Sequence, residues 1–166
     1  QKVRAIEQFS QPHPLSIKAA VGACKRYLSE PDAFRIKLAD LIADESRRVA
    51  TELKQGSLNN TSETVNTATV TSRVRKYEGA CQTLIAIAFQ VGRWGDINAA
   101  RQLADALRRL YATKEVQGAP LWLAYQGYPV TLITYAAMLG ASFEARCDVI
   151  APILTAELER AYNGPI

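Results

Sequence analysis

The chain has 166 residues, of which 48% are hydrophobic and 22% are charged, and its formal net charge at pH 7 is +4. This composition supplies a substantial core without disulfides or a structural metal, and so small a positive charge does not by itself indicate a nucleic-acid partner. We expect residues 1–166 to form one domain. The lack of a methionine at residue 1 also predicts a fragment of a larger protein.

Apolar residues recur at helical spacing along almost the whole chain, and the only strand-like alternation is a threonine-rich run at 67–71. The first helix is expected at 15–29, with Ala20, Cys24 and Leu28 on its inner face. A Ser-Glu-Pro-Asp sequence ends this helix and starts a second one that runs to about residue 55, because proline is tolerated in a first helical turn. A polar loop is predicted at about 56–64.

The third and fourth helices are predicted to form a hairpin at about 72–112. The β-branched residues that precede it favour an irregular start, so a regular helix is expected only from about Ser72. Asp96 is a good N-cap for the fourth helix, along which Ile97, Ala100 and Leu103 should be buried. A loop is expected at 114–119.

No charged residue lies between Glu115 and Glu144, and this run is either a membrane segment or the centre of a soluble core. A spanning helix needs about 20 mostly apolar residues, but polar groups interrupt the run and no Lys or Arg cluster flanks it closely. We therefore favour a buried helix. Gly127 and Pro129 should divide or kink it.

The end of the uncharged run is predicted to be a helix boundary. Gly140 suits the position after a helix, and Ser142 suits the N-cap of a last helix at 143–162. Pro152 should kink or interrupt that last helix.

Residues 84–92 and 132–140 share the pattern L-I-x-x-A-x-x-[VL]-G at an offset of 48 residues. Some helical-hairpin repeats have a period of roughly 40–47 residues. We hypothesise two related αα-hairpins, at about 72–112 and 121–162. Any two apolar helices that end in glycine would look alike, so chance similarity is the alternative.

Residues 121–154 resemble a segment in C-terminal helical accessory domains of large bacterial proteins, some of them linked to antiphage defence. The matching positions are Trp122, Tyr128, Pro129, Leu132, Tyr135, Gly140 and Phe143. The resemblance implies an accessory or regulatory domain without catalytic residues of its own. The spacing at 95–107 is also similar to the second helix of a tetratricopeptide hairpin, which implies similar packing.

Residues with catalytic or metal-binding chemistry are few and scattered. The single histidine, His13, lies between two prolines, which is typical of a loop. Cys24, Cys81 and Cys147 occupy apolar helical positions without a CxxC pair, so we expect buried, unreactive thiols and a reducing, cytoplasmic setting. We predict no catalytic residue, metal or cofactor.

Neighbouring carboxylates could in principle perform acid–base chemistry. The candidates are Asp40, Asp44 and Glu45, or Glu157 and Glu159. In the first set, Arg47 and Arg48 follow three residues after two of the carboxylates. Ion pairing along the surface of a helix explains this spacing better than catalysis does.

Two sets of residues are candidate binding sites. Aromatic side chains could line a groove for a partner helix or a small ligand, with core packing as the alternative; they are Trp94, Trp122, Tyr125 and Tyr128. Basic side chains could contact phosphates, with Trp94 stacking on a base, although interleaved carboxylates favour an ordinary solvated face. The basic candidates are Arg73, Arg75, Lys76, Arg93, Arg101, Arg108 and Arg109.

We therefore expect an all-α domain of five to seven helices packed as antiparallel hairpins. Its expected role is that of a non-enzymatic interaction, sensing or assembly module of a larger bacterial multidomain protein, with a protein or a neighbouring domain of the same chain as partner. The alternatives are a nucleic-acid-binding domain on the basic residues and a membrane-peripheral module on the uncharged 116–143 run. Integral membrane insertion is not expected.

Overall fold

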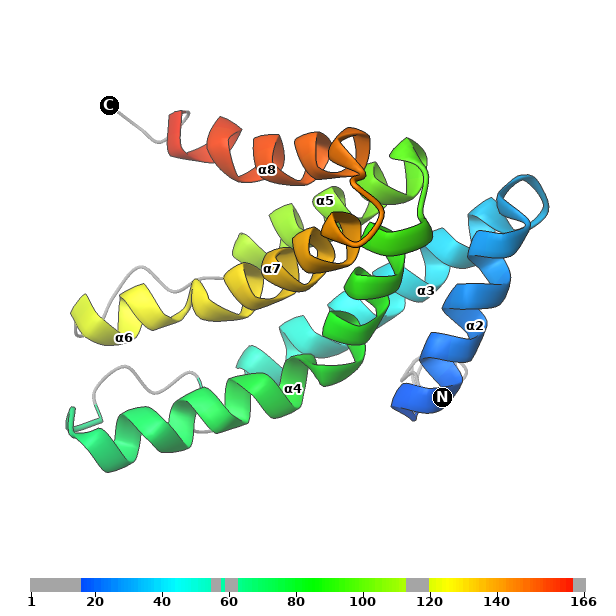
Figure 1. The fold of residues 1–166 in the computed structure, drawn as a ribbon. Helices are drawn as coiled ribbons and strands as arrows, with labels where there is room; N and C mark the ends of the chain where they lie inside the picture. The colour runs from blue at the N-terminus through cyan, green and yellow to red at the C-terminus, as the bar shows by residue number, and fades with distance from the viewer. Residues whose placement is uncertain (1–15, 55–57, 59–62, 113–119, 163–166) are drawn as a thin grey trace, which may run out of the picture.

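The structure is a computed structural model that describes residues 16–54, 58, 63–112 and 120–162, with side chains described up to residue 155. In these residues the chain forms seven α-helices and no strand (Figure 1). The expected all-α architecture is therefore confirmed. The loop predicted at 114–119 and most of the loop predicted at 56–64 lie outside the described residues.

The helices follow one another with short connections where the connection is described. Their bounds are α2 Ile17–Ser29, α3 Pro31–Lys54, α4 Thr67–Trp94, α5 Ile97–Tyr111, α6 Pro120–Tyr125, α7 Tyr128–Ser142 and α8 Cys147–Tyr162. Two expected caps are present, because Pro31 opens α3 and the Asp96 carboxylate accepts a hydrogen bond from the Ala99 amide at 2.8 Å. As predicted, the uncharged run is divided into two helices at this point: Gly127 is the N-cap of α7, and Pro129 lies in the first turn of that helix.

Two parallel helices form the centre of the molecule. α4 and α7 run in the same direction, and α5 and α8 return beside them and pack on each other (Figure 1). The Tyr128 hydroxyl contacts Glu78 at 3.1 Å, whereas Arg93 contacts Glu144 near the ends of α4 and α7. α2 and α3 pack together and cover α4 and α5. The chain is thus built from packed helical hairpins.

The start of α4 differs from the prediction. The helix begins at Thr67, five residues before the expected Ser72, and the β-branched run is helical. The Asn66 side chain accepts a hydrogen bond from the Thr69 amide at 2.9 Å, and the Thr69 hydroxyl accepts one from the Asn66 amide at 3.0 Å. This reciprocal cap satisfies amides at the helix start, which outweighs the weak helix propensity of the residues that follow.

The boundary between α7 and α8 also differs from the prediction. Gly140 lies inside α7, Ser142 is the last residue of that helix, and α8 begins at Cys147 instead of residue 143. The turn between them includes Ala145, which has a positive φ of 52°. α8 continues through Pro152.

Close contact between α4 and α7 explains why Gly140 lies inside a helix. A Cβ atom at Gly92 would lie 1.9 Å from the Ala137 carbonyl oxygen, and one at Gly140 would lie 2.2 Å from the Phe89 carbonyl oxygen. The two contacts are equivalent under the 48-residue offset of the repeated pattern, since it relates Gly92 to Gly140 and Phe89 to Ala137. The pattern therefore marks a symmetric helix contact, in which glycine lets the two backbones touch.

The uncharged run is only partly buried. Trp122 and Ile133 are fully enclosed, but Leu121 and Leu139 are exposed. No helix in the described part of the chain is both long and apolar enough to span a bilayer. The run thus supplies core residues on one side and an apolar surface on the other.

Candidate functional site

The outer face of α7 carries a row of exposed side chains without charge. Thr131, Tyr135 and Leu139 follow one another at one-turn spacing, and Phe143 continues the row at the C-cap. We call these four residues the α7 stripe. The exposed fractions are 63% for Tyr135 and 62% for Phe143, which are large for aromatic side chains.

The buried face of α7 is rich in small residues. Ala136, Ala137, Gly140 and Ala141 are buried against the neighbouring helices, together with the larger Ile133. Glycine and alanine let the backbones of α7 and α4 approach closely. The opposite face of the helix presents Tyr135 to solvent.

The end of the stripe is fixed by contacts with α4. The Phe143 ring lies edge-on to Phe89, with 6.0 Å between the ring centroids. The Arg93 guanidinium lies 5.6 Å from the Phe143 ring centroid and 3.4 Å from a Glu144 carboxylate oxygen. An aromatic group with a charged pair at its edge is a common composition for a protein interface.

The predicted aromatic candidates do not form one surface. Trp122 is fully buried, and Tyr125 packs edge-on against it with 6.2 Å between the ring centroids. Tyr128 is half-buried, and its hydroxyl group donates a hydrogen bond to the Glu78 carboxylate. Burial, and to a smaller extent this hydrogen bond, raises the pKa of Tyr128. Trp94 alone is exposed, with the cations of Lys25 and Arg93 over its ring.

The predicted basic residues also lie apart. Arg73 is only 2% exposed, because its side chain turns inward to Trp122 and Glu63. Arg93 lies at the end of α4, beside the α7 stripe. The remaining five lie on two different parts of the surface. Arg75 and Lys76 are exposed on the first half of α4, and α5 carries Arg101, Arg108 and Arg109, of which Arg108 is half-exposed.

The carboxylates near Arg47 and Arg48 are engaged in ion pairs, as the sequence predicted. Asp44 pairs with Arg47, and Glu45 pairs with Arg48 at 2.9 Å. Glu45 is buried, however, and Arg48 also donates to the Ala80 carbonyl oxygen at 2.8 Å. This arginine therefore joins α3 to α4 and has a structural role that its sequence position did not reveal.

The cysteines differ in exposure, contrary to the prediction of three buried thiols. Cys24 and Cys81 are buried, and burial raises the pKa of each to about 12. Cys147 is exposed, because it is the first residue of α8 and the inner face of that helix is formed by Val149 and Ile153.

We expect one thiol of the native protein to react rapidly with a disulfide reagent at pH 8, and all three to react in denaturant. The two buried thiols are neutral at this pH and shielded from the reagent. Counting the released chromophore tests this, with Cys147→Ser as control. Rapid reaction of any thiol in the native Cys147→Ser protein would contradict it.

Other groups with chemical potential are sparse in the part of the chain that is described. Within it, no three His, Cys, Asp or Glu side chains gather closely enough to hold a metal ion. His13 lies outside the described residues, as do the side chains of Glu157 and Glu159.

Neither the family models, nor the curated proteins, nor the solved structures include a match to this chain. The α7 stripe was not among the predicted site residues, although two of its aromatic residues belong to the resemblance noted at 121–154. The signal that could have found it is the series of small residues at 136, 137, 140 and 141, which marks the buried face of α7 and places Tyr135 on the opposite face.

Proposed function

We propose that this chain is a helical protein-interaction module, and that the α7 stripe binds a partner protein or a neighbouring domain of a larger protein. The observation that carries the proposal is the exposure of Tyr135 and Phe143 on one uncharged helix. Of the ten exposed large hydrophobic residues among those described, four lie in the uncharged run, and the others are spread between residues 17 and 111. Single exposed apolar residues are ordinary, whereas a group on one face marks an interaction site.

Binding would depend on complementary shape and on the burial of apolar surface, and no covalent bond would form or break. α7 is held rigidly by its close contact with α4, so its aromatic side chains lose little freedom when a partner covers them. Tyr135 and Phe143 would act as anchors, and the Arg93–Glu144 pair would lie at the edge of the contact. The same rigid presentation suits a sensing or assembly role within a larger protein.

Site-specific photocrosslinking in the cells of origin tests this proposal. We expect a photoreactive phenylalanine analogue at Tyr135 or Phe143 to give a discrete crosslinked product, because a partner covers these positions. The matched control places the analogue at Ile36, which is exposed on α3 and away from α7.

The crosslinked species would be identified by mass spectrometry. Absence of a product at both stripe positions, with a folded protein, would contradict the proposal. Equal products at Ile36 would contradict it as well, since they would show that contact is not confined to the stripe. Crosslinking to lipid alone would instead support a membrane-peripheral module.

A further inference from the structure

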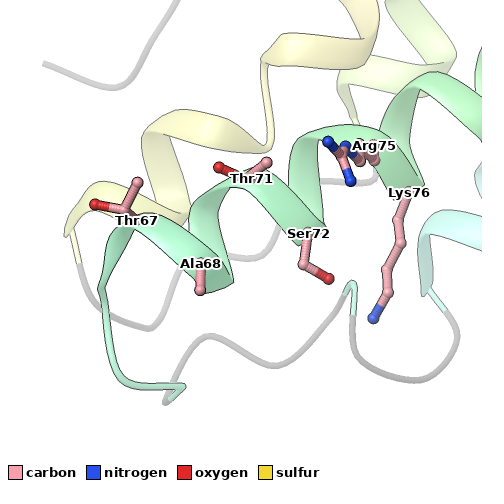
Figure 2. A pocket seen from close by; sticks show the side chains of 6 residues that line it. All are labelled: Thr67, Ala68, Thr71, Ser72, Arg75 and Lys76. Atoms are coloured by element: carbon pink, nitrogen blue, oxygen red, sulfur yellow. The ribbon is translucent and has the colours of Figure 1, made fainter.

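A second surface, on the first half of α4, has a different chemical character. Among the described residues, side chains of this helix line an open hollow of about 710 Å³. Figure 2 shows these side chains from close by. Apart from Ala68, these side chains are hydrogen-bond donors. We call them the α4 donor face; they are Thr67, Thr71, Ser72, Arg75 and Lys76.

The described residues that line this hollow include two cations and no carboxylate. The sequence from Thr64 to Tyr77 has no Asp or Glu, and its third cation, Arg73, is turned inward to Glu63. All five residues of the donor face are exposed. Hydroxyl, guanidinium and ammonium groups on one surface suit a ligand that carries negative charge and several acceptor oxygens.

The donors are also regularly spaced. Thr67, Thr71 and Arg75 occupy successive turns of the helix, and Ser72 and Lys76 form a second row beside them (Figure 2). One helical turn advances about 5.4 Å, so donors recur at that interval along the axis. A row of this kind fits a ligand whose acceptor groups repeat along a line.

The basic residues of α5 lack these properties. The hollow between α5 and α8 that Arg101 and Arg108 line also contains Asp105 and Asp148. Asp105 pairs with Arg108 at 2.5 Å, so carboxylates occupy the same surface as the cations. These carboxylates would repel an anionic ligand. The basic residues of α5 are therefore a suitable control for those of the α4 donor face.

We propose that the α4 donor face binds the phosphate backbone of a single-stranded nucleic acid, without sequence preference. Protein contacts to nucleic-acid phosphates come mainly from Arg, Lys, Ser and Thr side chains, which are the residue types present here. The face is separate from the α7 stripe, so this activity is independent of the proposed protein interaction. Of the seven basic residues that the sequence suggested as phosphate contacts, the proposed site includes only Arg75 and Lys76.

Binding is tested by the fluorescence anisotropy of a labelled oligo(dT) strand, titrated at several salt concentrations. Two phosphate contacts should give a slope of log K against log salt of about −1.4, since each contact contributes about −0.7 for single strands. The variant Arg75→Ala/Lys76→Ala should bind at least about tenfold more weakly at low salt. The control Arg101→Ala/Arg109→Ala loses the same charge on α5 and should bind as the unmodified protein does.

A third variant separates hydrogen bonding from charge. Thr71→Ala/Ser72→Ala should weaken binding and leave the salt slope unchanged, because it removes two hydroxyl donors and no charge. The proposal is overturned if the unmodified protein does not bind the strand at low salt, or if both arginine-containing double variants lose affinity equally. Binding of inorganic phosphate without binding of the strand would overturn it too.

Discussion

The Gly92→Ala and Gly140→Ala proteins should each be less stable than the unmodified protein by about 1–3 kcal/mol, as is typical of overpacking at a tight contact. A methyl group at either position would occupy the space of a carbonyl oxygen on the facing helix, at 1.9 Å from Ala137 or 2.2 Å from Phe89. These oxygens belong to helical backbone, so α4 and α7 would have to separate. Separation would loosen the packing of Ile133 and its neighbours in the core.

The matched controls are Gly22→Ala and Gly79→Ala. Both glycines lie inside helices, and a Cβ at either would meet no atom within 4 Å. Each substitution should stabilise the protein by about 0.5–1 kcal/mol, because alanine favours a helix more than glycine does. Denaturant unfolding followed by circular dichroism measures all four variants. If Gly92→Ala were as stable as Gly79→Ala, the close contact between α4 and α7 would be wrong.

At Gly92 and Gly140 the sequence predicted one part of the structure correctly and another part wrongly. The repeated pattern was visible, and so was its offset, but the glycine in each copy was interpreted as the end of a helix. A glycine after an apolar helix and a glycine at a helix contact have the same local sequence. Only the position of the facing helix distinguishes them, and that position is a long-range property.

Helix starts were predictable where one side chain performs the capping. Asp96 was identified as an N-cap and has that role, whereas the start of α4 was placed five residues too late. The cap of α4 needs Asn66 and Thr69 together, and weak helix propensity after it obscured the signal. Ile97 was also expected to be buried, but it lies in the first turn of α5 and is 42% exposed.

The binding surfaces were harder to predict than the fold. Aromatic residues are both core and interface residues, so sequence alone did not separate buried Trp122 from exposed Tyr135. Arginine has a similar ambiguity: Arg73 and Arg75 are two residues apart on α4, yet one is buried and the other exposed. The two buried residues, Trp122 and Arg73, contact each other and belong to one cluster of side chains.

That cluster joins the start of α4 to α6. The Arg73 guanidinium lies 3.9 Å from the centroid of the Trp122 ring and 2.8 Å from a Glu63 carboxylate oxygen. The Trp122 ring nitrogen donates to the Glu63 backbone carbonyl oxygen at 2.8 Å. Stacking and ion pairing from one planar cation require arginine, since the lysine ammonium has no plane to lie on the indole.

Trp122→Ala should therefore destabilise the protein by about 3–5 kcal/mol, the usual cost of removing a large buried aromatic side chain. Arg73→Lys should cost about 1–3 kcal/mol, because its ammonium would be buried without the full set of contacts. The control is Arg75→Lys, a change between exposed cations two residues away, which should be neutral within about 0.5 kcal/mol. Denaturant unfolding compares the three variants.

Hydrogen exchange locates the effect, because the cluster holds α6 and residues 63–66 against α4. In Arg73→Lys, amides of α6 and of the first turns of α4 should exchange faster, whereas those of α2 should be unchanged, since the contacts that join Glu63, Arg73 and Trp122 involve no residue of α2. A uniform increase over all helices would instead indicate a global loss of stability. Equal stability of Arg73→Lys and Arg75→Lys would show that the buried cation contributes nothing that an exposed one does not.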